Sequence, residues 1–306
     1  MTVTELVTHS GGFHADEILS TVVLSRLYPE ARRLRSRDPA LTSSAPGRIV
    51  YDVGRAYDAT AGLFDHHQKP APLRPDATPY SSFGLIWHHF GADYLRALAV
   101  PEADLAALHA DLDDSLVRPI DLMDNGALDP SAAGPLAGLT LPALLERMKP
   151  PFDAGGPGAE EAAFETALGL ARTVLEASVA TLAARARAEG RVLAAIAETG
   201  NRRVLELPQG MPHLSAIEKA GADHLLFVIH PRDGDWALNT IRKSAGTFDS
   251  RADLPAAWAG LTDAALEQAS GVPGARFCHN ARFIAVAATR EAVMALAEKA
   301  VAEALA

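Results

Sequence analysis

Short apolar runs and longer stretches of helical periodicity alternate along the first half of the chain. Residues 3–8 (VTELVT) alternate between apolar and polar positions and are rich in β-branched side chains, which predicts a strand. The same criteria predict further strands at 31–36, 49–54 and 63–64, and helices at 16–27, 81–90 and 102–124. Strands that alternate with helices in this way predict an α/β domain with a largely parallel sheet.

A cluster of prolines and glycines at residues 150–158 interrupts this pattern. An Ala-rich helix is predicted next, at 159–189, with Gly190 as its C-terminal cap. The rest of the chain predicts a second α/β unit, with strands at 203–207, 224–230, 236–242 and 283–287 and a final helix at 290–305. We therefore place a domain boundary near residue 190, which gives an N-terminal domain of residues 1–190 and a smaller C-terminal domain of residues 191–306.

Composition narrows the class of protein. The chain has 306 residues and a formal charge of −10, which argues against a general long-range attraction to nucleic acid but allows a short one held by a few arginines. The single cysteine, Cys278, excludes an intrachain disulfide and a multi-cysteine metal cage. No apolar run approaches about 18 residues, and no secretory signal is recognised at the N-terminus. We expect a cytoplasmic protein that does not span a membrane.

Histidines and aspartates are concentrated where the predicted strands end. In open α/β sheets, ligands bind beyond the carboxyl ends of the strands, so the predicted organisation brings these side chains to one edge of the sheet. They are His9, His14, Asp16, Asp52, His66 and His67. Mixed imidazole and carboxylate ligands suit Mn, Zn, Co or Fe better than Ca, which prefers oxygen ligands. The pattern therefore favours a metal site in the N-terminal domain.

Taken one at a time, these residues also fit structural roles. An aspartate at a strand end, such as Asp52, commonly forms a turn or caps a helix. Asp16 and Glu17 at a helix start commonly complement the helix dipole. Their joint occurrence at successive strand ends, in order along the chain, is what favours a function.

Four segments follow one another in a characteristic order. They are His9-Ser-Gly-Gly-Phe-His14-Ala-Asp16-Glu17, Val50-Tyr-Asp52-Val-Gly54, Asp65-His66-His67 and Asp121-Leu-Met-Asp124-Asn-Gly126. This ordered set resembles the four motifs of the DHH phosphoesterase superfamily, and most closely those of the Myg family (melanocyte-proliferating-gene type). Residues 35–39, 81–86 and 254–261 also resemble that family, so the likeness covers nearly the whole chain.

The resemblance implies a DHH-phosphoesterase-like fold of two domains, with the active site in the cleft between them. It also implies a divalent-metal-dependent phosphoesterase, similar to 3′→5′ exonucleases that release nucleotides from short RNA or oligonucleotides by means of a metal-activated water. Two alternatives stay open. One is a phosphatase for a small molecule or a cyclic-dinucleotide phosphodiesterase, and the other is a metal or nucleotide sensor without turnover. The oligomeric state also stays open, a homo-oligomer included.

Carried over by position, the resemblance implies metal ligands from the first three motifs: His9, His14, Asp16, Asp52 and His66. The fourth motif adds Asp124 or, one helical turn earlier, Asp121. Two ions are implied, with Mn favoured and Mg, Co and Zn as alternatives. Asp52 is the expected bridging ligand, because a carboxylate can bind two metals.

Further residues are expected to act on the substrate. His67 is expected to contact a phosphate oxygen or to protonate the leaving group, and Asp65 to orient a neighbouring histidine. Substrate contacts are expected from Arg37, Lys69, Ser81 and Ser82 in the N-terminal domain and from Arg242 and His279 in the C-terminal domain. In the C-terminal domain, Ala285–Ala288 replaces a glycine-rich run of the family, so side chains occupy positions where glycine allows a close approach of substrate.

Overall fold

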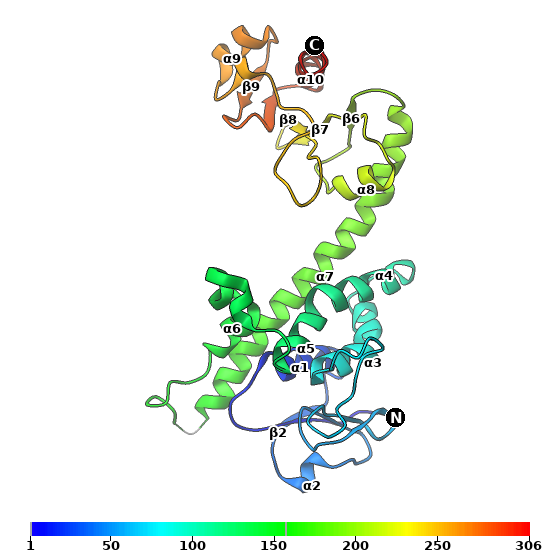
Figure 1. Cartoon of the computed structure of the whole chain (residues 1–306), viewed down its shortest axis with the longest axis vertical. Coiled ribbons are helices and arrows are strands. Elements are labelled where there is room, and N and C mark those ends of the chain that lie inside the picture. The colour runs from blue at the N-terminus through cyan, green and yellow to red at the C-terminus, as the bar shows by residue number, and fades with distance from the viewer. Residues whose placement is uncertain (1, 157) are drawn as a thin grey trace. The chain divides into compact units, whose positions relative to one another are not determined.

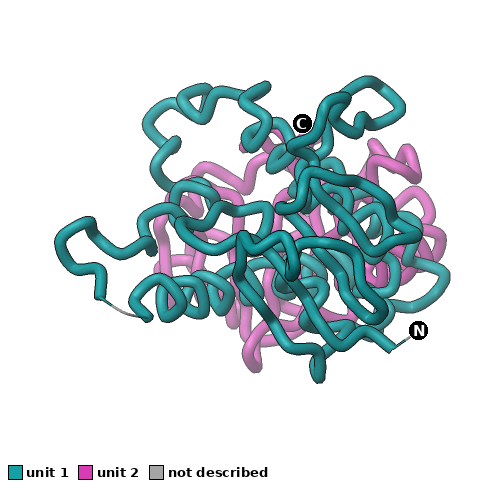
Figure 2. Tube along the Cα trace, turned by 90° about the horizontal axis from the view of Figure 1, so that it is seen from below, with its two compact units in different colours: residues 1–183 teal, residues 184–306 magenta. Residues whose placement is uncertain are grey.

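The computed structural model describes residues 2–156 and 158–306, and Figure 1 shows the elements. The chain divides into two compact units, residues 1–183 and 184–306 (Figure 2). This division and the boundary expected near residue 190 both fall within one long helix, α7 (Ala159–Thr199). Each unit contains its own five-stranded sheet, as expected for a two-domain α/β protein.

The sheet of unit 1 has the strand order β2-β1-β3-β5-β4. Its strands are β1 (Glu5–Thr8), β2 (Arg32–Arg35), β3 (Arg48–Tyr51), β4 (Tyr57–Asp58) and β5 (Leu63–Phe64). All neighbours are parallel except β4, which pairs antiparallel with β5, so the predicted largely parallel sheet is confirmed. The chain leaves β1 for β2 on one side and then crosses to β3 on the other. The carboxyl ends of β1 and β3 therefore form a topological switch point, where α/β proteins bind ligands.

The central helix of unit 1 is α1 (Ala15–Leu27), which packs against α3 (Ser82–Ala97). Every residue from Ala15 to Leu24 is buried, so this part of the helix has no face open to solvent. The single helix predicted at 102–124 is interrupted: α4 (Glu102–Leu112) and α5 (Arg118–Asp124) are joined by a π-helical turn, η2 (Asp113–Val117). The shorter elements are α2 (Pro39–Thr42), η1 (Ala59–Ala61), η3 (Pro130–Leu139) and α6 (Leu141–Glu146).

Helix α7 continues beyond the predicted end at Glu189. Gly190 is not a cap but an exposed position inside the helix, where one glycine costs only about 1 kcal/mol and the helix formers after it continue the structure. The helix ends before Gly200, whose φ is +59°.

Helix α7 is long and apolar enough to be considered as a membrane span. An 18-residue window of α7 has a mean hydropathy of 1.3, so this helix could cross a membrane by length and composition alone. Its apolar residues Phe164, Leu168 and Leu175 are nevertheless buried within unit 1, as in the core helix of a globular protein.

Unit 2 has a mixed sheet with the strand order β6-β7-β8-β10-β9. Its strands are β6 (Val204–Glu206), β7 (Phe227–Arg232), β8 (Asp235–Thr240), β9 (Ala275–Cys278) and β10 (Ile284–Ala287). Its helical elements are α8 (Leu214–Lys219), η4 (Ala256–Trp258), α9 (Asp263–Ser270) and α10 (Arg290–Ala304). Strand β9 was not predicted, because four residues between two turns carry too short a pattern to distinguish a strand from a loop.

The alanine run that begins at Ala285 lies inside the sheet and is not a substrate loop. Ala285 and Ala287 are fully buried and belong to the same apolar cluster as Leu296 of α10. Their strand, β10, pairs with β8 on one side and with β9 on the other. These two side chains therefore fill the core of unit 2 and do not occupy a substrate surface.

Candidate metal centre

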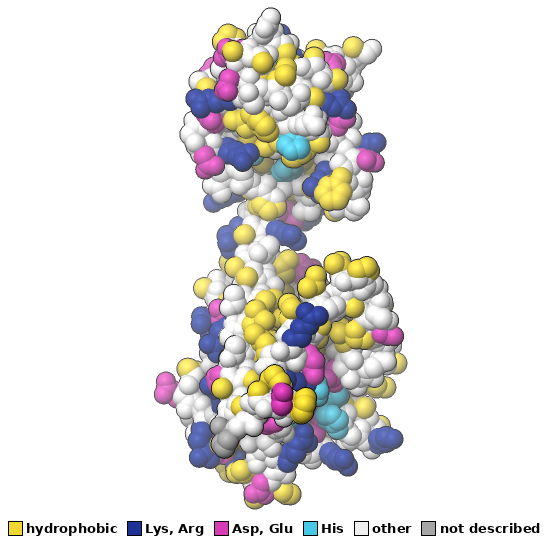
Figure 3. Space-filling model, turned by 90° about the vertical axis from the view of Figure 1, so that its left-hand side faces the viewer, with side chains coloured by type: hydrophobic (Ala, Val, Ile, Leu, Met, Phe, Trp, Pro, Cys, Tyr) yellow, Lys and Arg dark blue, Asp and Glu magenta, His cyan; other side chains and the backbone are white. Residues whose placement is uncertain are grey.

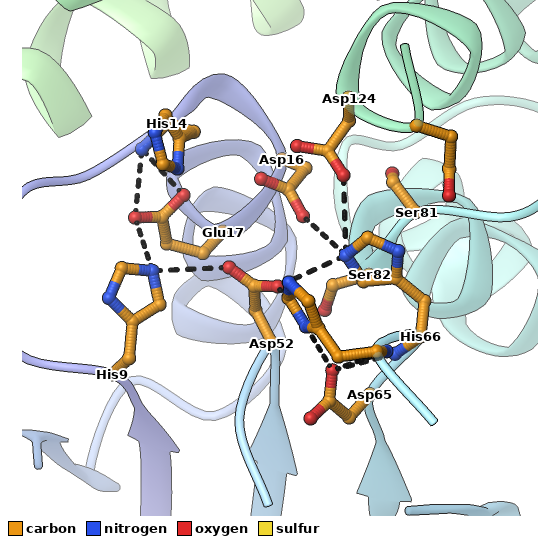
Figure 4. A network of polar contacts seen from close by, with 12 residues as sticks. His9, His14, Asp16, Glu17, Asp52, Asp65, His66, Ser81, Ser82 and Asp124 are labelled. Atoms are coloured by element: carbon orange, nitrogen blue, oxygen red, sulfur yellow. Dashed lines mark hydrogen bonds and ion pairs between the residues drawn. The ribbon is translucent and has the colours of Figure 1, made fainter. Parts of the chain in front are cut away.

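The carboxyl ends of three parallel strands supply most of the predicted ligands (Figure 4). His9 follows β1, Asp52 follows β3, and Asp65, His66 and His67 follow β5. Asp52 has a φ of +55°, a strained value for a residue with a side chain. Backbone strain of this kind is concentrated at functional sites, because the surrounding structure has to hold it in place.

The first turn of α1 supplies the remaining ligands from the first motif. His14 is the N-cap of this helix, and its backbone N–H donates to both carboxylate oxygens of Glu17, at 2.9 and 2.8 Å. Asp16 and Glu17 are both buried, at 1% and 0% exposure. A helix dipole alone does not require burial, so these two acids do more than complement it.

The imidazole of His9 lies between two carboxylates. Its Nε2 atom is 3.1 Å from Oε1 of Glu17 and 3.2 Å from Oδ2 of Asp52. On the other side of the ring, Nδ1 lies 3.2 Å both from the Ser10 carbonyl oxygen and from a guanidinium nitrogen of Arg37. Metal ligation by Nε2 requires the tautomer in which Nδ1–H donates to Ser10.

The imidazole of His66 faces three carboxylates. Its Nε2 atom lies 3.2 Å from Oδ2 of Asp124, 3.4 Å from Oδ1 of Asp52 and 4.0 Å from Oδ2 of Asp16. The two shorter contacts lack the geometry of a hydrogen bond, and this nitrogen has no hydrogen-bond partner. Asp124 comes from the last residue of α5, so the fourth motif joins the same cluster as the first three.

Four atoms of this cluster are buried without a hydrogen-bond partner: Oδ1 and Oδ2 of Asp16, Oδ1 of Asp52 and Nε2 of His66. Buried polar atoms are almost always paired in proteins, because leaving them unpaired costs about 1–3 kcal/mol each. All four belong to residues whose oxygen or nitrogen atoms lie close enough together to bind one cation, in the groups Asp16–His66–Asp124 and Asp16–Glu17–Asp52. The donor set therefore fits divalent metal ions that accept both imidazole and carboxylate.

The pKa values of Asp16, Asp52 and His9 reflect the close spacing of several buried carboxylates in this cluster. Burial raises the pKa of Asp16 well above its usual value, and the nearby charges of Asp52 and Asp124 raise it further. Burial also favours the neutral form of Asp52, but contacts with His66 and His9 outweigh it and lower the pKa of Asp52 to about 2. Burial lowers the pKa of His9, whereas Asp52 and Glu17 together raise it to about 10. A divalent cation would relieve the repulsion that these carboxylates share.

Comparison with known proteins identifies the family. The family model MYG1_exonuc, described as "Uncharacterised protein family (UPF0160)", matches residues 5–301. This chain belongs to that family. It is 32% identical to MYG1 exonuclease from Homo sapiens, over 97% of this chain and 85% of the human protein. It is 31% identical to a MYG1 protein from Schizosaccharomyces pombe, over 97% of each chain. The membership expected from the four motifs is confirmed.

The chain also resembles solved structures at low identity. RecJ in complex with Mn²⁺ from Thermus thermophilus is 16% identical, with a TM-score of 0.27. That comparison covers 98% of this chain and 52% of RecJ, so the chain spans about half the length of that protein. A second structure, exonuclease RecJ bound to manganese, is also 16% identical and has a TM-score of 0.26, with 98% and 90% of the two chains covered.

The third motif also holds His67, none of whose atoms is among the buried, unpaired atoms of the cluster. Nδ1 of His67 lies 2.7 Å from Oδ1 of Asp65, and this contact raises the pKa of His67. Asp65 is 1% exposed and also accepts hydrogen bonds from the backbone N–H groups of Arg55, His66 and His67. The orienting role expected for Asp65 thus has a geometric basis, and its partner is His67.

Asp121 of the fourth motif lies apart from the ligand cluster. Its Oδ1 accepts from the backbone N–H and the hydroxyl of Ser81, at 3.0 and 2.7 Å. Its Oδ2 accepts from Nε and Nη2 of Arg74, at 2.9 and 2.7 Å. A carboxylate with four hydrogen bonds has no lone pair left for a cation. The structure therefore favours Asp124 as the ligand from this motif.

Ser81 and Ser82 do not contact a substrate through their hydroxyls. Both are fully buried. Ser81 caps α3 and holds Asp121, and the hydroxyl of Ser82 donates to the Phe64 carbonyl oxygen. The two hydroxyls therefore have structural roles, whereas the expected contact of phosphate with backbone N–H groups at the start of α3 stays a prediction.

A cavity of about 750 Å³ lies beside the cluster and is lined by residues of all four motifs. Of the predicted substrate contacts, Arg37 and Lys69 line it. Gln68 and Asn125 line it as well but were not singled out from the sequence, and neither was Glu17 as a neighbour of His9. Gln68 directly follows the third motif, and Glu17 and Asn125 belong to the first and fourth, which is the signal that could have found them. Figure 3 shows histidines beside acidic side chains on this face of unit 1.

Arg242 and His279 belong to unit 2 and are described there. Arg242 lines a cavity of about 1300 Å³, together with Lys243, Phe248 and Phe283. Its guanidinium lies 4.8 Å from the centre of the Phe248 ring, and the ring of His279 lies 4.4 Å from that of Phe283. Phe248 is 89% exposed.

Proposed function

We propose that this protein is a divalent-metal-dependent phosphodiesterase that removes nucleotides from the 3′ end of short RNA or oligonucleotides. The cluster of buried, unpaired imidazole and carboxylate atoms in unit 1 carries this proposal, because no structural role accounts for it. Relatives in the same family support the choice of substrate, since those from Homo sapiens and Bos taurus are named MYG1 exonuclease. Mn is the favoured metal, and the ligand set is also compatible with Mg, Co and Zn.

Asp52 is the proposed bridging ligand. Its Oδ2 faces His9 and its Oδ1 faces His66, so one carboxylate lies between the two histidines that would each bind one ion. When bound, two such ions supply a nucleophilic water at neutral pH and neutralise charge on the phosphate. The chain's part is to hold this set rigidly. The strand ends and the buried first turn of α1 do so.

His67 is the proposed proton donor to the leaving oxygen. Asp65 accepts a hydrogen bond from Nδ1–H, which fixes the ring and leaves Nε2 for a substrate. The His67 side chain is 55% exposed and lines the same cavity as the ligands, so a phosphodiester can reach it. Arg37 and Lys69 on the walls of this cavity are proposed to bind phosphate oxygens.

We propose that unit 2 contributes Arg242 and His279 to substrate binding. A cation over an exposed aromatic ring, as in the pair of Arg242 and Phe248, is typical of surfaces that bind single-stranded nucleic acid. The ring of His279 lies 4.4 Å from that of Phe283, at an interplanar angle of 47°, and Phe283 lines the same cavity. Stacking of bases on exposed aromatic rings tolerates any base, as an exonuclease requires.

The test uses the full chain with 5′-labelled short RNA and Mn²⁺, resolved on a denaturing gel. We expect a ladder shortened from the 3′ end that disappears in Asp52→Ala, while His67→Gln lowers kcat by about 10²–10⁴-fold. Asp111→Asn, an exposed aspartate outside the centre, is the control and keeps full activity. A protein that binds Mn²⁺ but hydrolyses only small phosphodiesters would overturn the exonuclease proposal. Binding without any hydrolysis would point to a sensor.

A further inference from the structure

Arg74 is a buried arginine that takes no part in the proposed reaction. Its side chain is 8% exposed and lies in the segment 66–81, which leads from β5 to α3. One side of the guanidinium donates to Oδ2 of Asp121 from Nε and Nη2, at 2.9 and 2.7 Å. The other side donates to Asp113 from Nη1 and Nη2, at 2.5 and 3.0 Å. Both carboxylates come from the continuous helical stretch of η2 and α5.

The hydrogen bonds of Arg74 connect two of the segments that carry proposed metal ligands. His66 begins the segment that contains Arg74, and Asp124 lies one helical turn after Asp121 on α5. These ligands face each other, with Nε2 of His66 3.2 Å from Oδ2 of Asp124. Segment and helix are tied at a further point, where Nδ2 of Asn125 donates to the Tyr80 carbonyl oxygen at 3.1 Å.

The side chains of Asp121 and Arg74 are closely packed where α5 meets the start of α3 and the segment before it. A Cβ added to Gly84 would lie 2.3 Å from a carboxylate oxygen of Asp121, so only glycine admits this side chain against the start of α3. The Tyr80 ring covers the guanidinium of Arg74, with 4.7 Å between the guanidinium carbon and the ring centre. A buried ion pair adds little net stability over an apolar pair of similar volume, whereas its planar fork fixes distance and direction.

We propose that Arg74 is a positioning residue of the metal centre. Its fork to Asp121 and Asp113 holds α5 against the segment 66–81, so that Asp124 and His66 stay at the separation at which one cation binds both. This inference rests on the metal site of the proposed function. It predicts that the fork determines metal affinity even though none of its atoms touches the metal.

The test measures the dissociation constant of Mn²⁺ by calorimetry on the EDTA-stripped full chain, at a temperature at which every variant is folded. We expect Arg74→Met to weaken Mn²⁺ binding by about 10–100-fold, as for other residues that orient metal ligands. Arg74→Lys keeps the charge but not the fork and is expected to restore only part of the affinity. Arg96→Met is the matched control, since Arg96 forms a similar pair of hydrogen bonds with Glu102 on the surface. This variant is expected to bind Mn²⁺ with the affinity of wild type.

A purely structural role for Arg74 gives a different result. Leu175→Ala, which removes a fully buried side chain of α7, measures the effect of lost stability alone. If Arg74→Met lowers the urea midpoint as this variant does but binds Mn²⁺ as tightly as wild type, the proposal is wrong.

Two further outcomes can be told apart from a failure of this inference: a variant that does not fold, and a failure of the proposed exonuclease function. Should Arg74→Met not fold, the double variant Arg74→Met/Asp121→Asn removes the charge of Arg74 together with that of its fully buried partner and leaves only the partly exposed Asp113. Wild-type Mn²⁺ affinity in this variant would equally overturn the proposal. A wild-type chain that binds Mn²⁺ without cleaving RNA refutes the exonuclease function and leaves this inference standing. A wild-type chain that binds no Mn²⁺ refutes both.

Discussion

Asp121 and Asp124 lie on one face of α5, yet their surroundings give them different roles. Four donors from Ser81 and Arg74 surround Asp121, whereas Asp124 faces His66. The difference depends on Gly84, because any side chain at that position would displace the Asp121 carboxylate. At the scale of single residues, the missing Cβ of Gly84 therefore lets the Asp121 carboxylate reach the donors that occupy it.

We expect Gly84→Ala to lower the free energy of unfolding by about 3 kcal/mol, because the added Cβ overlaps a buried, hydrogen-bonded carboxylate. Urea denaturation followed by circular dichroism measures the change. Gly169→Ala is the matched control: that glycine is exposed on α7, its added Cβ meets nothing within 4 Å, and the variant is expected to gain about 1 kcal/mol. Equal stability of Gly84→Ala and wild type would contradict the packing described here.

At the scale of elements, the residue pattern of helix α7 predicts that a helix forms but not where it ends. The Ala-rich sequence from Ala159 predicts the helix, but the glycine at 190 is ambiguous between a cap and an interior position. The structure places the end at Thr199 because Gly200, with a φ of +59°, takes the left-handed conformation and Gly190 does not.

Substitution of the two glycines should therefore have opposite effects. Gly190→Ala is expected to raise the free energy of unfolding by about 1 kcal/mol, because alanine is the better helix former at an exposed interior position. Gly200→Ala is expected to lower it by about 1 kcal/mol, because a side chain is strained at positive φ. Thermal unfolding of both variants measures the difference. Destabilisation by Gly190→Ala would place the helix end at residue 190 after all.

At the scale of the whole molecule, the metal centre concentrates buried negative charge in a chain that is already acidic. Asp16 has both oxygens buried and unpaired, so it destabilises the metal-free fold at neutral pH. Its pKa is raised in the folded state, so protonation relieves this penalty, and the metal-free protein gains stability as the pH falls through that raised pKa.

Removal and addition of metal should change the stability of the fold, because a bound cation would neutralise the buried charge of Asp16. Mn²⁺ at about 100 times its dissociation constant is expected to stabilise the EDTA-stripped protein by about 2.7 kcal/mol. Asp16→Asn should make the stripped protein about 1–3 kcal/mol more stable than wild type, lose its gain at low pH and abolish the effect of Mn²⁺. Scanning calorimetry with and without Mn²⁺ measures both. Asp111→Asn is the control, and a wild-type response to Mn²⁺ in Asp16→Asn would rule out Asp16 as a ligand.

The sequence by itself determined the α/β fold of unit 1, the family, and the residues of the proposed metal centre that follow strand ends. His9, Asp52 and His66 were accessible because local periodicity locates strand ends, and parallel strands bring those ends to one edge. The ordered motifs then identified the family, which the match of the family model over residues 5–301 confirms.

Only the tertiary structure decided which direction each buried side chain faces. Arg74, which lies 47 residues away along the chain, donates two of the four hydrogen bonds to Asp121, and no local pattern encodes that contact. Glu17 looked like a dipole partner until burial placed it against His9. The physical reason is the same in both cases. Periodicity reports which face of an element is apolar, whereas hydrogen bonds and charge pairs depend on packing between segments that are distant in sequence.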